Sequence, residues 1–336
     1  SAYEISLGLV GSEMCIRDRM SASVKLNPRE MATFAAEGLL RLDGIVPDSI
    51  NQQFLAEAGP FNKPKGAERP DQRTNTLTNF MARSQLPAVT AGTVLDTAYK
   101  ETTALGGLVR LPRVRGAIES LVGSNSLVDH HFLHLALPSS FYEAAGLPQR
   151  SQHTHQDSTI DPRRAFDIQI FYFPHEVGPH MGGTRYVPGT HLRIVSESAI
   201  ARYQNIRGQQ HVVCPAGTLI FMHHGIWHGG GVNRSDEVRY MFKIRLNPSV
   251  PQVRLWDTSD LSDEDFQQRP IFFRKEPTNP NDIASLLTRP QPWFEGDTGR
   301  LEYINRIRFW RYLLGDESFD ADYWVTRIEN EPSTSV

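Results

Sequence analysis

The chain has 336 residues, of which 39% are apolar and 22% are charged, so it can bury about three quarters of its unfolded surface in a sizeable core. These values exclude a disordered tail and a disulfide-stapled mini-protein. The 35 basic and 38 acidic side chains give a formal charge of -3 without a long run of either sign, so we expect neither nucleic acid nor an anionic membrane as a partner.

The first nineteen residues lack the basic segment that opens a targeting signal. They include the phrase GSEMCIRDR, which resembles translated sequencing-adapter sequence. We therefore expect residues 1–19 to be a disordered, non-native extension and the natural chain to begin near Met20. The two cysteines, Cys15 and Cys214, are too few for a disulfide framework, which predicts a reducing, cytoplasmic location.

Helices and a short strand are predicted in the N-terminal part. From Asn27 the pattern indicates a helix that ends at Gly38, then a strand at Leu39–Leu42 and a second helix capped near Asp48. Helical spacing returns between residues 94 and 121. This opening says little about chemistry.

Between residues 127 and 248 the sequence has strand-like runs separated by Gly and Pro turns: HFLHLAL, DIQIFYF, TRYVPG, HVVCPAGTLIFM and VRYMFKIRL. Their spacing predicts an antiparallel jelly roll or barrel, and not the alternating strands and helices of a doubly wound sheet. The fold class we expect is mainly β with flanking helices.

The tail changes character after residue 250. Its apolar residues fall at helical spacing between Leu301 and Leu314. We expect this helix to pack on the barrel or on a second subunit, which would make a homodimer through the C-terminal helix. A lid over the substrate is the alternative.

Histidine is concentrated in one part of the chain: the stretch from His153 to His228 holds nine of the twelve histidines. Within it, His155 and Asp157 are two residues apart, so in an extended segment both point to one face and can reach one ion. His228 is a further candidate ligand. Two histidines and one carboxylate form the facial triad of non-haem Fe(II) oxygenases, which leaves coordination positions open for a co-substrate and dioxygen.

Arg239 follows His228 by eleven residues and opens the strand VRYMFKIRL. A co-substrate such as 2-oxoglutarate would chelate the metal at one end, and its far carboxylate would need a cation at a fixed distance. An arginine meets a carboxylate with two parallel hydrogen bonds. Arg239 is therefore the predicted anchor.

These motifs resemble the phytanoyl-CoA dioxygenase family of Fe(II)/2-oxoglutarate oxygenases. The resemblance covers about residues 27–248 and rests on EGLLRLDGIV, HQD at 155–157, GGTRYVPGTH at 182–191, CPAGTLIFMHHGIWHGGGVNRS, and the position of Arg239. It implies a double-stranded β-helix (jelly roll, cupin-like) with His155, Asp157 and His228 on iron. It also implies Arg239 on 2-oxoglutarate, with Gln156 and Asn233 shaping the pocket.

The sequence departs from the family at two positions. Gly230 stands where members often have a serine that helps hold the co-substrate, and Phe171 stands where an aromatic residue such as Trp is frequent. Gln169, two residues before Phe171 and on the same strand face, is a candidate to supply a replacement hydrogen bond.

The sequence leaves two alternatives open. His153, His155 and Asp157 also match the H-x-H-x-D start of a binuclear zinc site in metallo-β-lactamase-like hydrolases, but Ser158 stands where those enzymes have a further histidine. The other alternative is a catalytically silent barrel that binds a small molecule.

We therefore expect an Fe(II)- and 2-oxoglutarate-dependent dioxygenase that uses O2 to hydroxylate an unactivated C–H bond of a small-molecule substrate, with succinate and CO2 as co-products. Its catalytic domain is expected at residues 20–250, and a helical extension packed on that domain at residues 251–336. The substrate itself is not encoded in any motif that we recognise.

Overall fold

The computed structural model describes residues 24–61, 84–144, 146–157, 161–193, 195–201, 205–261, 283–295 and 298–319. The expected extension at residues 1–19 lies outside these ranges. Among the described residues, no helix is long and apolar enough to cross a membrane.

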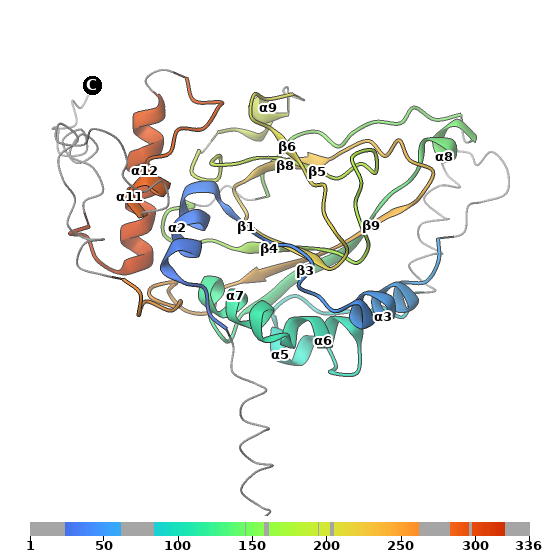
Figure 1. Ribbon diagram of the computed structural model, residues 1–336, viewed down its shortest axis with the longest axis horizontal. Helices are drawn as coiled ribbons and strands as arrows, with labels where there is room; N and C mark the ends of the chain where they lie inside the picture. The colour runs from blue at the N-terminus through green and yellow to red at the C-terminus, as the bar shows by residue number, and fades with distance from the viewer. Residues whose placement is uncertain are drawn as a thin grey trace, which may run out of the picture.

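Two antiparallel sheets form the centre of the molecule (Figure 1). The large sheet has the order β1-β7-β4-β9-β3-β2, with β1 Leu39–Leu42, β2 Thr93–Val94, β3 Leu127–Ala136, β4 Ile168–Phe173, β7 Thr218–His223 and β9 Arg239–Asn247. The small sheet has the order β6-β5-β8, with β5 Thr184–Val187, β6 Gln210–His211 and β8 Trp227–Gly230. The expected jelly-roll architecture is confirmed.

Strand β4 explains why the large sheet is covered on both faces. All six of its residues are buried, and alternate side chains enter different apolar clusters. Ile168 and Ile170 join the large cluster that includes the helices, whereas Phe171 and Phe173 join a smaller cluster with Tyr186 of the small sheet. Because side chains alternate across a strand, helices cover one face and the small sheet covers the other.

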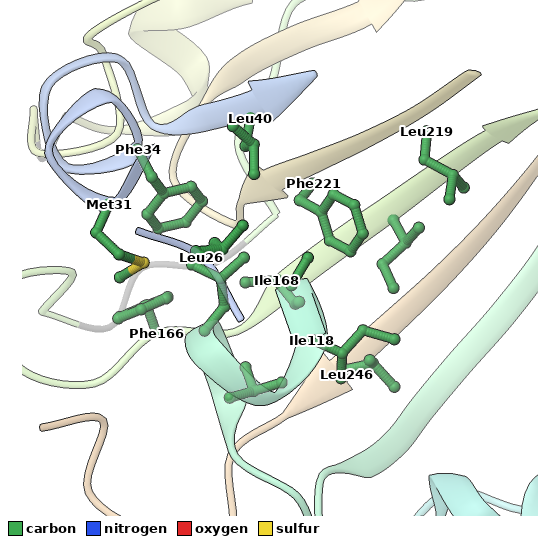
Figure 2. Close-up of a cluster of buried hydrophobic side chains, with 14 of the residues drawn as sticks. Leu26, Met31, Phe34, Leu40, Ile118, Phe166, Ile168, Leu219, Phe221 and Leu246 are labelled. Carbon is green, nitrogen blue, oxygen red and sulfur yellow. The ribbon is translucent and has the colours of Figure 1, made fainter. Parts of the chain in front are cut away.

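The N-terminal helices form the first cover. They are α2 Pro28–Glu37, α3 Asp48–Ala58, α5 Leu95–Ala98, α6 Ala104–Arg110 and α7 Pro112–Val122, and two short helices follow later, α8 Ser139–Ala144 and α9 Glu197–Ile200. Helix α2 begins at a capping box between Asn27 and Glu30 and ends at Gly38 with φ 76°. Figure 2 shows its Met31 and Phe34 beside Phe166 in the core.

The described part of the tail contains α11 Ile283–Leu287 and α12 Thr298–Leu314. Ile307, Phe309 and Trp310 of α12 are fully buried and belong to the same cluster as α2. Leu301, by contrast, is 59% exposed. Helix α12 therefore contributes to the apolar core of its own chain. A dimer contact stays a prediction.

Candidate metal centre

His155 and His228 come together through backbone pairing. His228 lies on β8, and His155 forms an isolated antiparallel bridge with it. Each of the two residues donates its main-chain N–H to the other's carbonyl at 2.9 Å. Directly paired residues point to the same face, and the two imidazole centroids are 4.4 Å apart.

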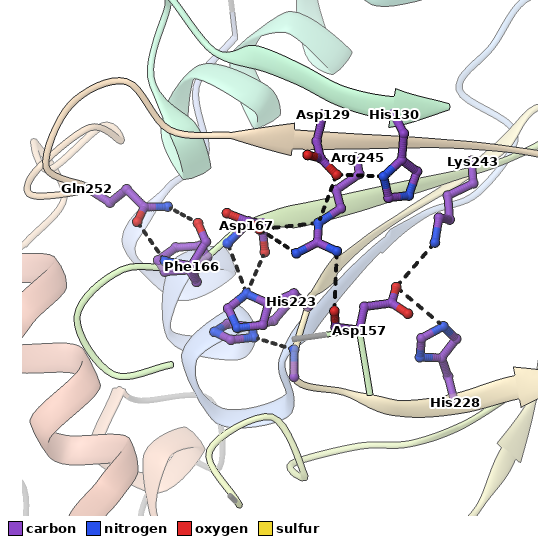
Figure 3. Close-up of polar contacts among 12 residues, drawn as sticks. Asp129, His130, Asp157, Phe166, Asp167, His223, His228, Lys243, Arg245 and Gln252 are labelled. Atoms are coloured by element: carbon purple, nitrogen blue, oxygen red, sulfur yellow. Dashed lines mark hydrogen bonds and ion pairs between the residues drawn. The ribbon is translucent and has the colours of Figure 1, made fainter. Parts of the chain in front are cut away.

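Asp157 completes the group. Its main-chain N–H donates to the His224 carbonyl at 3.1 Å, and its Oδ1 lies 3.4 Å from His155 Nε2. Its Oδ2 lies 3.9 Å from His228 Nε2. One ligand atom from each of the three residues lies within 4.8 Å of the others, and Figure 3 shows Asp157 between His228 and Lys243.

The donor atoms fit a divalent metal ion. His155 Nδ1 contacts the His153 carbonyl at 3.1 Å, and His228 Nδ1 contacts the Ile226 carbonyl at 2.9 Å. A carbonyl only accepts hydrogen bonds, so each Nδ1 carries a proton. Each Nε2 is directed toward Asp157 and offers its lone pair to a metal ion when the ring is neutral. Two imidazole nitrogens and one carboxylate match the facial triad of Fe(II).

The pKa shifts of Asp157 and His228 also suit a metal site. Burial opposes ionisation of Asp157, but the hydrogen bond with His155 and the charges of His228 and Lys243 outweigh it and hold its pKa well below the usual range. Burial lowers the pKa of His228 to about 4. Burial also acts against protonation of His155, yet the hydrogen bond to Asp157 raises its pKa. The carboxylate thus stays ionised and favours a positive charge at this position, which a metal can supply.

The glycine run after His228 serves backbone packing. A Cβ on Gly229 would lie 2.8 Å from the His153 carbonyl oxygen, and one on Gly231 would lie 2.6 Å from the Gly183 oxygen. Both contacts are with main chain. Side chains here would push the H-x-D segment and β5 away from β8, so the run keeps His155 and His228 paired.

Arg239 is 3% exposed and donates from Nη2 to the Gly182 carbonyl at 3.0 Å. Its Nε and Nη1 have no partner among the described residues. Burial lowers its pKa to about 10, so the guanidinium is charged at neutral pH. Unpaired buried donors of this kind are costly, and a carboxylate of 2-oxoglutarate would satisfy them.

Phe171 and Gln169 lie opposite different residues of β9. The Phe171 ring is 5.8 Å from the His228 ring, and Phe171 pairs with Lys243. Gln169 pairs with Arg245, six residues or about 20 Å along β9 from Arg239. The structure does not bring Gln169 to Arg239, although within the described chain its buried amide has no hydrogen-bond partner.

Asn233 and Gln156 are used in local structure. The Asn233 amide donates to two main-chain carbonyls at 2.7 and 2.8 Å and accepts from the N–H and hydroxyl of Ser235. These bonds fill its capacity, so it fixes the turn that leads into β9. The Gln156 amide donates to the Val195 carbonyl at 3.1 Å.

Three residues near Asp157 were not among the predicted site residues. Lys243 Nζ donates to Asp157 Oδ2 at 3.2 Å, and Arg245 donates to the Asp157 carbonyl at 3.3 Å. His134, on β3, has a pKa lowered to about 4 by burial. Period-two alternation from Arg239 would have found Lys243 and Arg245, because all three share one face of β9.

The family model for phytanoyl-CoA dioxygenase (PhyH) matches residues 34–241, more than half of the chain. The chain belongs to the phytanoyl-CoA dioxygenase family. It is therefore an oxidoreductase of the 2-oxoglutarate-dependent oxygenase type, with Fe(II), 2-oxoglutarate and O2 as its cofactors and co-substrates. No curated protein sequence matches the chain.

Solved structures with a similar fold are distant in sequence. The non-heme monooxygenase ThoJ is 17% identical over 66% of this chain and 78% of its own, with a TM-score of 0.43. The alpha-ketoglutarate-dependent carbocyclase SnoK from nogalamycin biosynthesis is 15% identical over 67% and 85%, with a TM-score of 0.45. HygX from Streptomyces hygroscopicus, solved with nickel and 2-oxoglutarate, is 11% identical over 70% and 94%, with a TM-score of 0.45.

The zinc hydrolase alternative requires His153 in the metal site. Within the described ranges, the group that could hold a metal consists of His155, Asp157 and His228 and does not include His153. The antiparallel sheets also differ from the alternating strands and helices that this alternative expects.

Proposed function

We propose that this protein hydroxylates an unactivated C–H bond of a small organic substrate and couples that step to decarboxylation of 2-oxoglutarate to succinate and CO2. One oxygen atom of O2 enters the substrate and the other enters succinate. Bound Fe(II) supplies the dioxygen and one-electron chemistry. His155, Asp157 and His228 hold the metal in this proposal. The geometry of this triad is the observation that carries it.

The chain's other residues orient the co-substrate. Two donor atoms of the buried Arg239 guanidinium have no partner among the residues that the structure describes, which supports a role in binding the far carboxylate of 2-oxoglutarate. Phe171 packs beside the His228 ring and contributes an apolar wall. Such a wall excludes water from the reacting centre. The cytoplasmic location and the homodimer remain predictions.

The test combines metal binding with product detection. Purified protein is titrated anaerobically with Fe(II) and 2-oxoglutarate, and then incubated in air with a metabolite extract to detect a product 16 Da heavier that depends on 2-oxoglutarate. We expect one Fe(II) per chain and loss of turnover in His228→Ala. The exposed His211 provides the control variant His211→Ala, which should keep turnover.

Three outcomes would contradict the proposal. Unchanged turnover in His228→Ala would remove the metal assignment. Two tightly bound zinc ions per chain would favour the hydrolase. Iron binding without any spectral response to 2-oxoglutarate would favour a silent barrel.

A further inference from the structure

The neighbours of Lys243 on the sheet restrict the orientation of its side chain. It lies on β9 directly opposite Phe132 of β3 and directly opposite Phe171 of β4. Directly opposed side chains are about 5 Å apart at Cβ, so the side chains of Phe132 and Phe171 are the cross-strand neighbours of Lys243. The Lys243 side chain is 11% exposed and that of Asp157 is 13% exposed. The Lys243 amine donates a hydrogen bond to the Asp157 carboxylate at 3.2 Å.

Arg245 holds the main chain of the same ligand. Its Nη1 donates to the Asp157 carbonyl, while its Nη2 pairs with Asp167 at 2.6 Å and its Nε lies 3.7 Å from Asp129. Asp129 lies at a register shift in β3 between Val128 and His130, and Figure 3 shows it beside Arg245. These contacts fix the guanidinium against β9.

Asp157 needs such support because it lies outside the strands. The bridge between His155 and His228 is a single pair, and Asp157 follows in an irregular segment. Its main-chain N–H has one contact, with His224. A carboxylate in such a segment loses rotamer freedom when it binds a metal, and that loss opposes binding unless the side chain is already ordered.

We propose that Lys243 is a positioning residue for the metal site: it holds Oδ2 of Asp157 and so keeps the carboxylate directed toward His155 and His228, while Arg245 fixes the Asp157 main chain. Strand β9 then orders the metal ligand through Lys243 and also carries the buried guanidinium of Arg239. This inference rests on the proposed function, because it assigns a role toward the same metal.

The lysine also carries a charge that repels a dication. Removing it therefore has two effects of opposite sign: a loss of order at Asp157, which weakens metal binding, and a loss of repulsion, which strengthens it. Partners of metal ligands typically change metal affinity by about 10- to 100-fold when removed. Positioning predicts that the loss of order is the larger effect.

The experiment measures Mn(II) affinity from the electron paramagnetic resonance signal of the free ion. Lys243→Met keeps the apolar stem and removes the amine, and Lys243→Arg keeps both charge and donors. Lys100→Met is the matched control, since Lys100 is an exposed lysine between α5 and α6. We expect Lys243→Met to bind Mn(II) about 10- to 100-fold more weakly than wild type, and Lys243→Arg and Lys100→Met to bind within about threefold of it.

Hydrogen exchange of the metal-free proteins gives a second reading. The peptide that contains His155 and Asp157 should exchange faster in Lys243→Met than in wild type, and at the wild-type rate in Lys100→Met. Mn(II) binding by Lys243→Met that is equal to wild type or tighter would overturn the inference, as would unchanged exchange. Failure of wild type itself to bind Mn(II) would instead refute the proposed function.

Discussion

Arg239→Met tests the co-substrate anchor most directly. The Arg239 side chain is 3% exposed, and its Nε and Nη1 have no hydrogen-bond partner within the described part of the chain. Hydrogen bonds between a charged group and a carboxylate contribute about 1.5–3 kcal/mol each. Two such bonds contribute at least about 3 kcal/mol, and each 1.4 kcal/mol is a factor of ten. We therefore expect 2-oxoglutarate binding to weaken by about 100-fold or more.

The assay is a titration of anaerobic Fe(II) protein with 2-oxoglutarate, followed by the absorbance that chelation produces. Arg239→Lys keeps the charge without the planar pair of donors, so its dissociation constant should lie between those of wild type and Arg239→Met. Fe(II) affinity should persist in both variants, because Arg239 is not one of the three metal ligands.

Equal 2-oxoglutarate affinity in Arg239→Met and wild type would refute this reasoning. Arg245 would not then be a ready substitute, because Asp167 already pairs with its guanidinium at 2.6 Å. Loss of Fe(II) binding along with 2-oxoglutarate binding would mean that Arg239 supports the whole site and is not a separate anchor.

Three further predictions follow from packing and titration. Gly229→Ala should weaken Mn(II) binding at least tenfold, because its Cβ would lie 2.8 Å from the His153 carbonyl oxygen. Gly230→Ala should not weaken it, because the nearest atom to its Cβ would be 3.5 Å away. Equal Mn(II) affinities of the two variants would contradict this prediction. Trp310→Ala should lower the free energy of unfolding by about 3–5 kcal/mol in urea titrations, and a loss below about 1 kcal/mol would place α12 outside the core. Burial lowers the pKa of His191 to about 3, so between about pH 6.5 and pH 3 this side chain is protonated in the unfolded chain but not in the folded one, and the stability of the fold should decrease as the pH falls through that range. His191→Gln should make the melting temperature depend less on pH in that range. An unchanged pH dependence would exclude His191 as its source.

Local sequence signals predicted the helices and strands whose ends are determined by neighbouring residues in the chain. The capping box at Asn27 and the glycine at Gly38 bound α2 as expected, and Leu39–Leu42 is a strand. The strand-like runs between Gly and Pro turns predicted antiparallel sheets, because short turns can join antiparallel but not parallel neighbours. The tail helix was also expected, since Ile307 and Trp310 lie on one helical face.

The sequence by itself determined which residue types are available for the chemistry. His155 and Asp157 stand out because they are two residues apart and suit a metal, and Arg239 stands out because it follows His228 by eleven residues and suits a carboxylate. Tertiary structure alone decided which of the remaining polar residues reach them. Strand order sets β9 between β4 and β3, so Lys243 contacts Asp157, whereas Gln169 lies about 20 Å along the strand from Arg239. Which strands become neighbours, and in which register, depends on packing between segments that are distant in the chain. No local sequence pattern carries that information.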